Sequence, residues 1–522
     1  MKFLEKNSIE TPVTKLLSIV QMDDSYTGET IFNKVQSEIL IDKDIQRNLM
    51  GTSSDQGSNV SSEGVGLAGR LQSEYPYTIH VSDFSHIYNL IFKEGTTVFP
   101  KTILDIISDI SSHFSRSPQR RAKFDDIQMK LGLDPLQVLK LSETRWLSMK
   151  ETLERILRLW DPLQVYYGEY EPRGLELFTT KNELFLKVLL TLISKVNHYN
   201  IRFQATQIYY DEILDLLDES FIVFGTLVVK KEHCNFDELY NLKFDYDRLD
   251  EIEDILLSEE EFAQEFVENN NLANLYNKIQ EEHKKEPLSI ARKFIIRILD
   301  EMKRRLPFQS PILRDIDVVF FRDFDKSKWK NLANKFTNII SQDQLGEFNN
   351  ELERFRVRFE RRYRDKIGSS FPFTAQWRNL SCDFPLLAKL ALSIAVLPHS
   401  SVPVERIFSQ LKDFKTGKRN RLTAKNIESS LLIYQAYGED TSSILTKEMF
   451  ENYKVKYKKE KSLEKEHKEN EEISLENLFE KSITIEEENI QEISMSKSES
   501  KLKRKGVGEL VREREGLKKT KY

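Results

Sequence analysis

Cysteine is scarce in this sequence. Only Cys234 and Cys382 occur among 522 residues, and two distant thiols cannot form a framework of disulfides or a cysteine-rich zinc site. They also exclude a zinc finger with two cysteine and two histidine ligands, because such a finger needs both thiols close together. A chain with so few thiols fits a reducing intracellular compartment.

Proline and glycine are also few, at 14 and 18 residues. Such low numbers leave little room for long flexible linkers and argue against an all-β architecture, which needs many tight turns. The 32 phenylalanines and the 11% aromatic content indicate packed cores through most of the chain. The length is enough for one large core or for two or three ordinary ones.

The sequence has neither a membrane span nor a global basic field. No apolar run reaches the roughly 18 to 20 residues of a span, and the start, MKFLEKNSIETPVTK, lacks the basic and then apolar layout of a signal peptide. We therefore expect a soluble intracellular protein without a membrane partner. Because the formal net charge is −6, any contact with nucleic acid must come from local basic patches.

Hydrophobic periodicity separates an α/β part from a helical part. Strand and helix patterns alternate between about 14 and 92, which is typical of an α/β layer. The predicted elements are a strand at 14–22, a helix at 27–40, a turn at 48–60, a helix at 66–76 and a strand at 77–84. From about 100 to 365 apolar residues recur every three or four positions, which predicts a long all-helical region.

The C-terminal part starts with a strongly apolar helix at 384–398. A proline-bounded turn, PHSSVP, follows it, and then come two further helical stretches, VERIFSQLKDF and NIESSLLIYQAYG, with the basic TGKRNRL between them. From about 451 the composition changes to Lys, Glu and Ser. That composition predicts a tail that is disordered or forms a solvated helix, because it offers no apolar face to bury.

Three stretches together resemble the hAT transposase family, in particular its domesticated branch. They are residues 27–90 with GTSSDQGSNV, residues 114–156 with SETRW, and residues 390–433 with PHSSVPVERIFSQLKDF. Their order and spacing match the family. The resemblance implies an α/β plus α fold, in which a large all-helical insertion interrupts a partial RNase H-like sheet. The implied parts are the first piece of the RNase H-like domain at 1–150, the insertion at 151–370, the last piece with the dimerisation region at 375–437, and the charged tail at 451–522.

The family's chemistry depends on three carboxylates that hold two divalent metal ions, which stabilise both the attacking and the leaving oxygen. By resemblance, Asp55 and Glu405 match the second and third of these acids. The strand with the first acid lies upstream of the TGE motif, and we expect it to be missing here. Asp23 and Asp24 follow a strand-like run, but a strand-terminating acidic turn explains them better. Strand transfer is therefore not expected, and Mg²⁺ is implied as a cofactor only for an active enzyme.

A second departure from the family concerns a Cys-x-x-His element that follows the second aspartate. The corresponding residues here are Asp83, Phe84, Ser85 and His86, so the histidine is kept and the cysteine is not. An isolated histidine forms a structural hydrogen bond more often than it binds a metal. We therefore predict no confident metal site.

Several basic segments are candidates for nucleic-acid contact. By resemblance, Arg145 and Trp146 in SETRW lie near a DNA end, where the indole can stack on an unpaired base. The alternative is that Trp146 anchors the following helix together with Leu147, Leu153 and Ile156. A second candidate is the cluster Lys415, Lys418, Arg419 and Arg421. Its clustered cations can contact phosphates, and a solvated turn between two helices explains them equally well. A second basic patch consists of Arg116, Arg120, Arg121 and Lys123, and KLKRK at 501–505 is a candidate nuclear import signal.

The C-terminal helices have more apolar positions than a small subdomain needs. A second copy of the chain is a plausible partner for such a face, and the resemblance implies a dimerisation region here. The alternative is that these side chains complete the protein's own core. The residues that we predict to support dimerisation are Leu386, Leu390, Ile394, Ile407, Phe408, Leu431 and Leu432.

The sequence thus predicts a transposon-derived protein that acts by homodimerisation, with DNA as a further partner, and without cutting DNA. Two alternatives are an active metal-dependent transposase and a pure protein-interaction scaffold. No phosphate-binding P-loop, nucleophile elbow or HExxH motif occurs, and we expect no small-molecule substrate. The expected location is nuclear or nucleocytoplasmic.

Overall fold

The structure is a computed structural model, which describes residues 2–3, 12–19, 22, 25–141, 148–205, 208–244, 249, 251–362, 373–414 and 423–437. The chain divides into two compact units, Met1–Gln435 and Ala436–Tyr522. All the elements below belong to the first unit, apart from the last two residues of its final helix. None of the described helices is long and apolar enough to cross a membrane.

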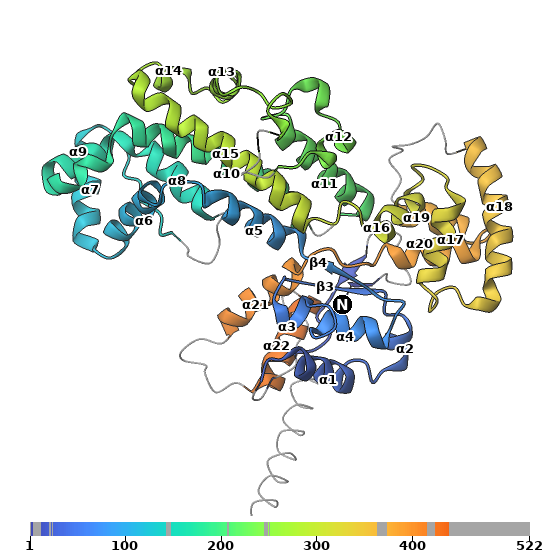
Figure 1. Ribbon diagram of the computed structural model, residues 1–522. Coiled ribbons are helices and arrows are strands. Elements are labelled where there is room, and N and C mark those ends of the chain that lie inside the picture. The colour runs from blue at the N-terminus through green and yellow to red at the C-terminus, as the bar shows by residue number, and fades with distance from the viewer. Residues whose placement is uncertain are drawn as a thin grey trace, which may run out of the picture. The chain divides into compact units, whose positions relative to one another are not determined.

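The N-terminal part contains two small sheets. β1 (Lys2–Phe3) pairs antiparallel with β2 (Val13–Thr14), whereas β3 (Gly51–Ser54) pairs in parallel with β4 (Ile79–Ser82). A parallel pair needs a crossover, which here contains the helices α3 (Ser58–Ser61) and α4 (Leu67–Glu74). The helices α1 (Gly28–Glu38) and α2 (Lys43–Arg47) precede the parallel pair, and α1 packs against α4 (Figure 1).

Two predictions for this part were wrong in detail. The predicted strand at 14–22 is limited to Val13–Thr14, and residues 15–19 form no regular element. The predicted turn at 48–60 contains β3, which the pattern missed because GTSS lacks the apolar alternation of a half-buried strand. The predicted helices at 27–40 and 66–76 and the predicted strand at 77–84 are confirmed by α1, α4 and β4. The two-stranded β3–β4 sheet agrees with a small α/β part, and its RNase H-like character stays a prediction.

Helices dominate the middle of the chain, as predicted for residues 100–365. Three long helices lie at its centre: α5 (Phe84–Thr96), α10 (Thr180–Phe203) and α15 (Glu281–Arg305), each packed against the other two (Figure 1). Gly95 allows the close approach of α5 to α15, because a Cβ there would lie 2.6 Å from Ile298 Cγ2. The other helices of this part are α6 (Lys101–Ser115), α7 (Pro118–Lys130), α8 (Ser148–Arg158), α9 (Trp160–Tyr170), α11 (Tyr210–Gly225), α12 (Phe236–Asn241), α13 (Glu259–Asn269), α14 (Ala273–Tyr276), α16 (Pro311–Asp315), α17 (Lys326–Lys335) and α18 (Leu345–Arg362).

The last four described helices are α19 (Phe373–Leu380), α20 (Pro385–Ile394), α21 (Val402–Phe414) and α22 (Ala424–Tyr437). α19 and α20 pack with α17 and α18 around aromatic side chains. Trp377 is fully buried, and its indole N–H donates to the carbonyl of Val319 at 2.8 Å. One hydrophobic cluster connects this group with the rest, because it includes Met50 beside β3, Phe294 of α15 and Leu397 after α20.

Candidate functional site

Two aspartates follow the two strands of the parallel sheet. Ser54 and Ser82 are register partners at the ends of β3 and β4, so Asp55 and Asp83 leave the sheet at the same edge. Asp55 is exposed, and its Oδ1 accepts a bond from the Gly57 backbone N–H at 3.3 Å. Asp83, by contrast, is buried with 1% of its surface exposed. Neighbouring strand ends therefore place the two carboxylates in very different surroundings.

Asp83 binds two segments that are far apart in the sequence. Its Oδ1 accepts the backbone N–H of His86 at 2.9 Å, which caps the first turn of α5. Its Oδ2 accepts the backbone N–H and the hydroxyl of Ser401, both at 2.6 Å, and the hydroxyl of Ser400 at 3.2 Å. A buried charge needs this many donors to offset its loss of water. We call Asp83, Ser400 and Ser401 the Asp83 junction.

The Asp83 junction lies at the start of α21. The carbonyl of Ser401 accepts the N–H groups of Val404 and Glu405 at 2.8 and 3.1 Å, so Ser401 begins the first helical turn. Glu405 is exposed in that turn. The family resemblance singles out Asp55 and Glu405, and the structure shows in addition that Asp83 binds the segment that leads to Glu405. The role of Asp83 could not be derived from spacing, since its partners are 317 and 318 positions away.

The same loop has two further polar supports. The hydroxyl of Tyr210 on α11 donates to the carbonyl of Pro398 at 2.6 Å. Gln204, which follows α10, donates to the Ser85 hydroxyl at 3.0 Å and accepts from Arg406 of α21 at 3.4 Å. A cavity of about 130 Å³ lies beside these residues, and Ser53, Gln204 and the loop from Pro398 to Val404 line it.

The carboxylates do not form a complete metal site in the part of the chain that the structure describes. No three His, Cys, Asp or Glu side chains gather there closely enough to hold a metal ion. Asp23 and Asp24 lie outside the described residues. Two-metal chemistry needs several carboxylates converging on both ions, so the described residues do not fit the Mg²⁺ pair that the resemblance implies.

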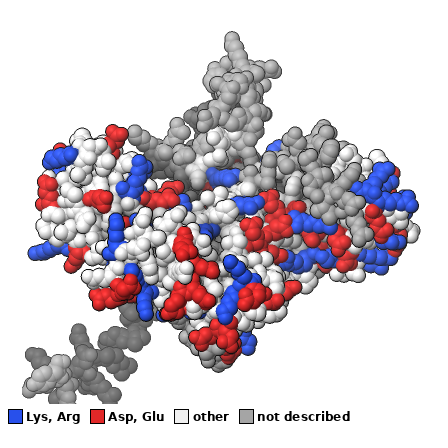
Figure 2. Space-filling model, turned by 90° about the horizontal axis from the view of Figure 1, so that it is seen from above, with Lys and Arg blue, Asp and Glu red and all other residues white. Residues whose placement is uncertain are grey.

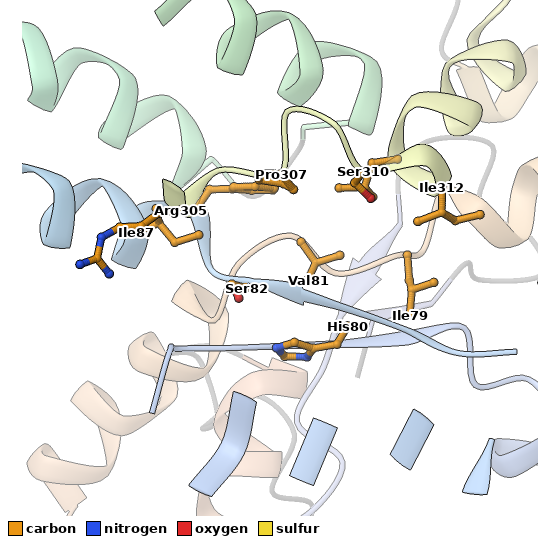
Figure 3. A pocket seen from close by; sticks show the side chains of 11 residues that line it. Ile79, His80, Val81, Ser82, Ile87, Arg305, Pro307, Ser310 and Ile312 are labelled. Atoms are coloured by element: carbon orange, nitrogen blue, oxygen red, sulfur yellow. The ribbon is translucent and has the colours of Figure 1, made fainter. Parts of the chain in front are cut away.

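A second cavity, of about 140 Å³, lies against β4. Ile79 and Val81 of β4 face Pro307 and Ile312, which follow α15 (Figure 3). The polar side chains of Ser82 and Ser310 line the cavity as well. His80 and Arg305 also border this cavity, but both are held within the chain. The His80 ring bonds to the Thr52 hydroxyl at 3.0 Å, and burial lowers the pKa of His80. Arg305 donates to Glu301 at 2.6 Å and to Gln56 at 3.2 Å.

The predicted dimerisation residues divide into a buried and an exposed group. Leu386, Leu390, Ile394 and Leu431 are buried in the chain's own core, with exposed fractions of 7%, 0%, 0% and 1%. A partner reaches them only if the fold opens. Ile407 is half-buried, and Phe408 and Leu432 are exposed at 55% and 38%. Val404 and Ile433 are exposed too, at 49% and 52%. They are not among the residues predicted from the sequence, although Val404 lies one helical turn before Phe408.

Most of the predicted nucleic-acid contacts cannot be placed. Arg145, Trp146, Lys415, Lys418, Arg419, Arg421 and the run 501–505 lie outside the described residues. Of the second basic patch, Arg120 pairs with Glu171 at 3.7 Å and Lys123 lies over the Tyr170 ring at 4.6 Å. Of the helix neighbours considered for Trp146, Leu153 and Ile156 are fully buried in the core, and Leu147 lies outside the described residues.

The C-terminal helices connect the chain to a known family. Residues 351–437, from within α18 to the end of α22, match the family model described as the hAT family C-terminal dimerisation region. The chain contains a hAT dimerisation region. This match confirms the resemblance to hAT-family transposase-derived proteins that the sequence motifs indicated. A search of curated proteins gave no match.

The hAT dimerisation region starts at a buried glutamate. Glu351 on α18 is 1% exposed, and its carboxylate accepts the backbone N–H groups of Leu386 and Leu387, each at 3.0 Å. Burial raises the pKa of Glu351, and the bonds from Leu387 and Leu386 partly oppose that shift. The region thus consists of a buried half around α18 and α20, and of two terminal helices, α21 and α22, that expose large apolar side chains.

Proposed function

We propose that this protein is a transposon-derived, hAT-like protein that acts by forming a homodimer through α21 and α22, and that it does not carry out strand transfer. The observation that supports this most is the hAT dimerisation region at 351–437. Its last two helices expose Val404, Phe408, Leu432 and Ile433. Large apolar side chains that stay exposed on the helices of a dimerisation region are typical of a protein–protein contact.

The packing of α21 supports a second copy as the partner. Among residues 402–411, whose side chains the structure describes, Val402 alone is buried. A helix of 13 residues is marginal in water unless its apolar face is covered. In a symmetric dimer the same surface of the other copy covers that face. The family description of the region as a dimerisation region favours this occupant over an unrelated protein.

Two observations support a protein without strand-transfer activity. Within the described residues, no trio of potential metal ligands gathers. In addition, Asp83 stands where the resemblance places a cysteine, and its carboxylate is engaged by three hydrogen-bond donors of Ser400 and Ser401 and by the N–H of His86. A carboxylate whose oxygens accept that many bonds has little capacity left for a metal ion.

Sedimentation of the full chain at micromolar concentration tests the dimer. We expect the wild type to be a dimer and Phe408→Glu to be a monomer, because the substitution places a charge in an apolar contact. Met129→Glu on α7 is the matched control, since Met129 is as exposed as Phe408, at 57% against 55%. A monomeric wild type, or an equal loss of dimer in both variants, would overturn the proposal.

A second candidate function is nucleic-acid binding in the nucleus, and the charge on α18 favours it. Arg354, Arg361 and Arg362 are exposed there, and in the described part of the chain no carboxylate lies within ion-pair distance of these three. Figure 2 shows Lys and Arg side chains, interspersed with Asp and Glu side chains, over the lobe that contains α17 and α18. Exposed cations without an acidic partner bind phosphates well, because the protein does not neutralise them itself.

A further inference from the structure

The orientation of α21 depends on polar contacts at its first turn. Val402 is its one buried side chain among residues 402–411, whereas Phe408 is 55% exposed. Core packing therefore contributes little to holding this part of α21. The helix is instead tied at its N-terminal end, where Ser401 belongs to the Asp83 junction and Arg406 donates to Gln204 at 3.4 Å.

Among these ties, the bonds to Asp83 are the strongest. Its carboxylate is 1% exposed, and one oxygen lies 2.6 Å from both the backbone nitrogen and the hydroxyl oxygen of Ser401. Short bonds to a buried charge exceed bonds between neutral groups in strength. The contact from Arg406 goes to a neutral carbonyl and is much longer. Removing the carboxylate would leave the part-buried Ser401 N–H without this acceptor, which is more costly than losing a fully exposed bond.

Asp83 also belongs to a different element from the helix that it holds. It ends β4 and caps α5 through the N–H of His86 at 2.9 Å. One carboxylate therefore fixes the positions of two helix N-termini, and both helix dipoles favour its negative charge. This group therefore connects the start of α21 to the end of the β3–β4 sheet.

We propose that Asp83 is a positioning residue for self-association, which holds α21 in the orientation in which Val404 and Phe408 meet a second copy of the chain. The inference rests on the proposed dimer. Asp83 does not touch the partner. It fixes the helix before the partner arrives, so that less conformational freedom is lost on binding.

The test compares Asp83→Ala with Asp55→Ala in the full chain. Asp55 is the matched control, because it ends the neighbouring strand but is exposed and bonds locally to Gly57. In Asp83→Ala we expect the dimer Kd to rise at least tenfold. We also expect amide hydrogen exchange in α21 to become at least tenfold faster, while exchange in α20 stays unchanged. Asp55→Ala should match the wild type in all three measurements.

A second pair of variants changes the serines of the Asp83 junction and keeps Asp83, in case Asp83→Ala does not fold. Ser400→Ala combined with Ser401→Ala removes both hydroxyl donors and leaves β4 and the cap of α5 intact. We expect it to weaken the dimer and to speed up exchange in α21. Ser401→Thr keeps the hydroxyl and the N–H, so its dimer Kd and its exchange in α21 should stay close to the wild type. If the loop simply tolerated no substitution, Ser401→Thr would be as impaired as the double alanine variant.

The outcomes separate this inference from the proposed dimer. A wild type that stays monomeric refutes the dimer, and faster exchange in α21 of Asp83→Ala then still shows that Asp83 holds the helix. A wild-type dimer whose Kd and α21 exchange do not change in Asp83→Ala refutes the positioning role alone. Equal loss of exchange protection in α20 and α21 also refutes it, because it would mean that Asp83 supports the whole fold and not the orientation of one helix.

Discussion

The carboxylate of Glu351 lies across the N-terminus of α20, where its Oε2 accepts the N–H of Leu387 at 3.0 Å. The residue before α20, Phe384, has no side chain that can cap the helix. Glu351 on α18 supplies the missing acceptor, although it lies 36 positions before Leu387 in the sequence. A helix N-terminus favours such a negative group, so the cap also ties the two buried helices of the hAT dimerisation region together.

Replacing Glu351 by alanine should lower the free energy of unfolding by about 1–3 kcal/mol, because two buried N–H groups lose their acceptor. Chemical denaturation of the full chain measures this change. Glu347→Ala is the control, since Glu347 is one turn earlier on α18 and exposed. A loss at Glu351 no larger than that at Glu347 would contradict the capping role.

The titration of the second buried glutamate, Glu301 on α15, should make the stability of the protein depend on pH. Its burial, at 2% exposed, raises its pKa, but the bonds from Arg304 and Arg305 at 2.5 and 2.6 Å together hold the pKa below the ordinary 4.5. A folded-state pKa that is lower than the unfolded one stabilises the fold above the unfolded value, and this stabilisation is lost as the pH falls through the folded value.

Glu301→Gln removes that titration. We expect the stability difference between wild type and Glu301→Gln to be largest near neutral pH and to shrink as the pH falls below about 4.5. Denaturant unfolding of both proteins across this range gives the difference. A difference that stays constant with pH, or grows on acidification, would show that the arginines do not hold the carboxylate ionised.

The sequence predicted the helices well, because apolar residues recur at helical spacing whether the surface they pack against is near or far along the sequence. β3 escaped prediction, since Gly51–Ser54 contains no apolar alternation. Spacing also could not tell that Leu390 and Ile394 belong to the chain's own core and that Phe408 does not. An amphipathic pattern shows that a face is covered, and not by which chain. The Asp83 junction could not be predicted for a different reason. Its hydrogen bonds join residues more than 300 positions apart, and such bonds leave no local pattern in the sequence.

We predict that the protein does not cut DNA, because among the described residues Asp55 and Asp83 at the strand ends do not belong to a gathered set of metal ligands. With labelled duplex DNA and Mg²⁺ or Mn²⁺, we expect no nicking above the level of a metal-free sample, because paired metal ions need a converging set of acids. Glu405→Gln tests the family position directly. Metal-dependent cleavage that this variant abolishes would identify an active enzyme and contradict the proposal of a protein without strand transfer.

The exposed arginines of α18 predict a salt-dependent contact with DNA. If Arg361 and Arg362 each contact a phosphate, Arg361→Glu combined with Arg362→Glu should weaken binding of a labelled duplex. It should also reduce the slope of log K against log salt by about 2. The matched control is Lys278→Glu with Lys285→Glu, which changes the charge equally at two exposed lysines beside and within the start of α15, away from every candidate contact. Equal weakening in both double variants would show a response to net charge alone. An unchanged slope in the α18 variant would show that these arginines do not touch the phosphates.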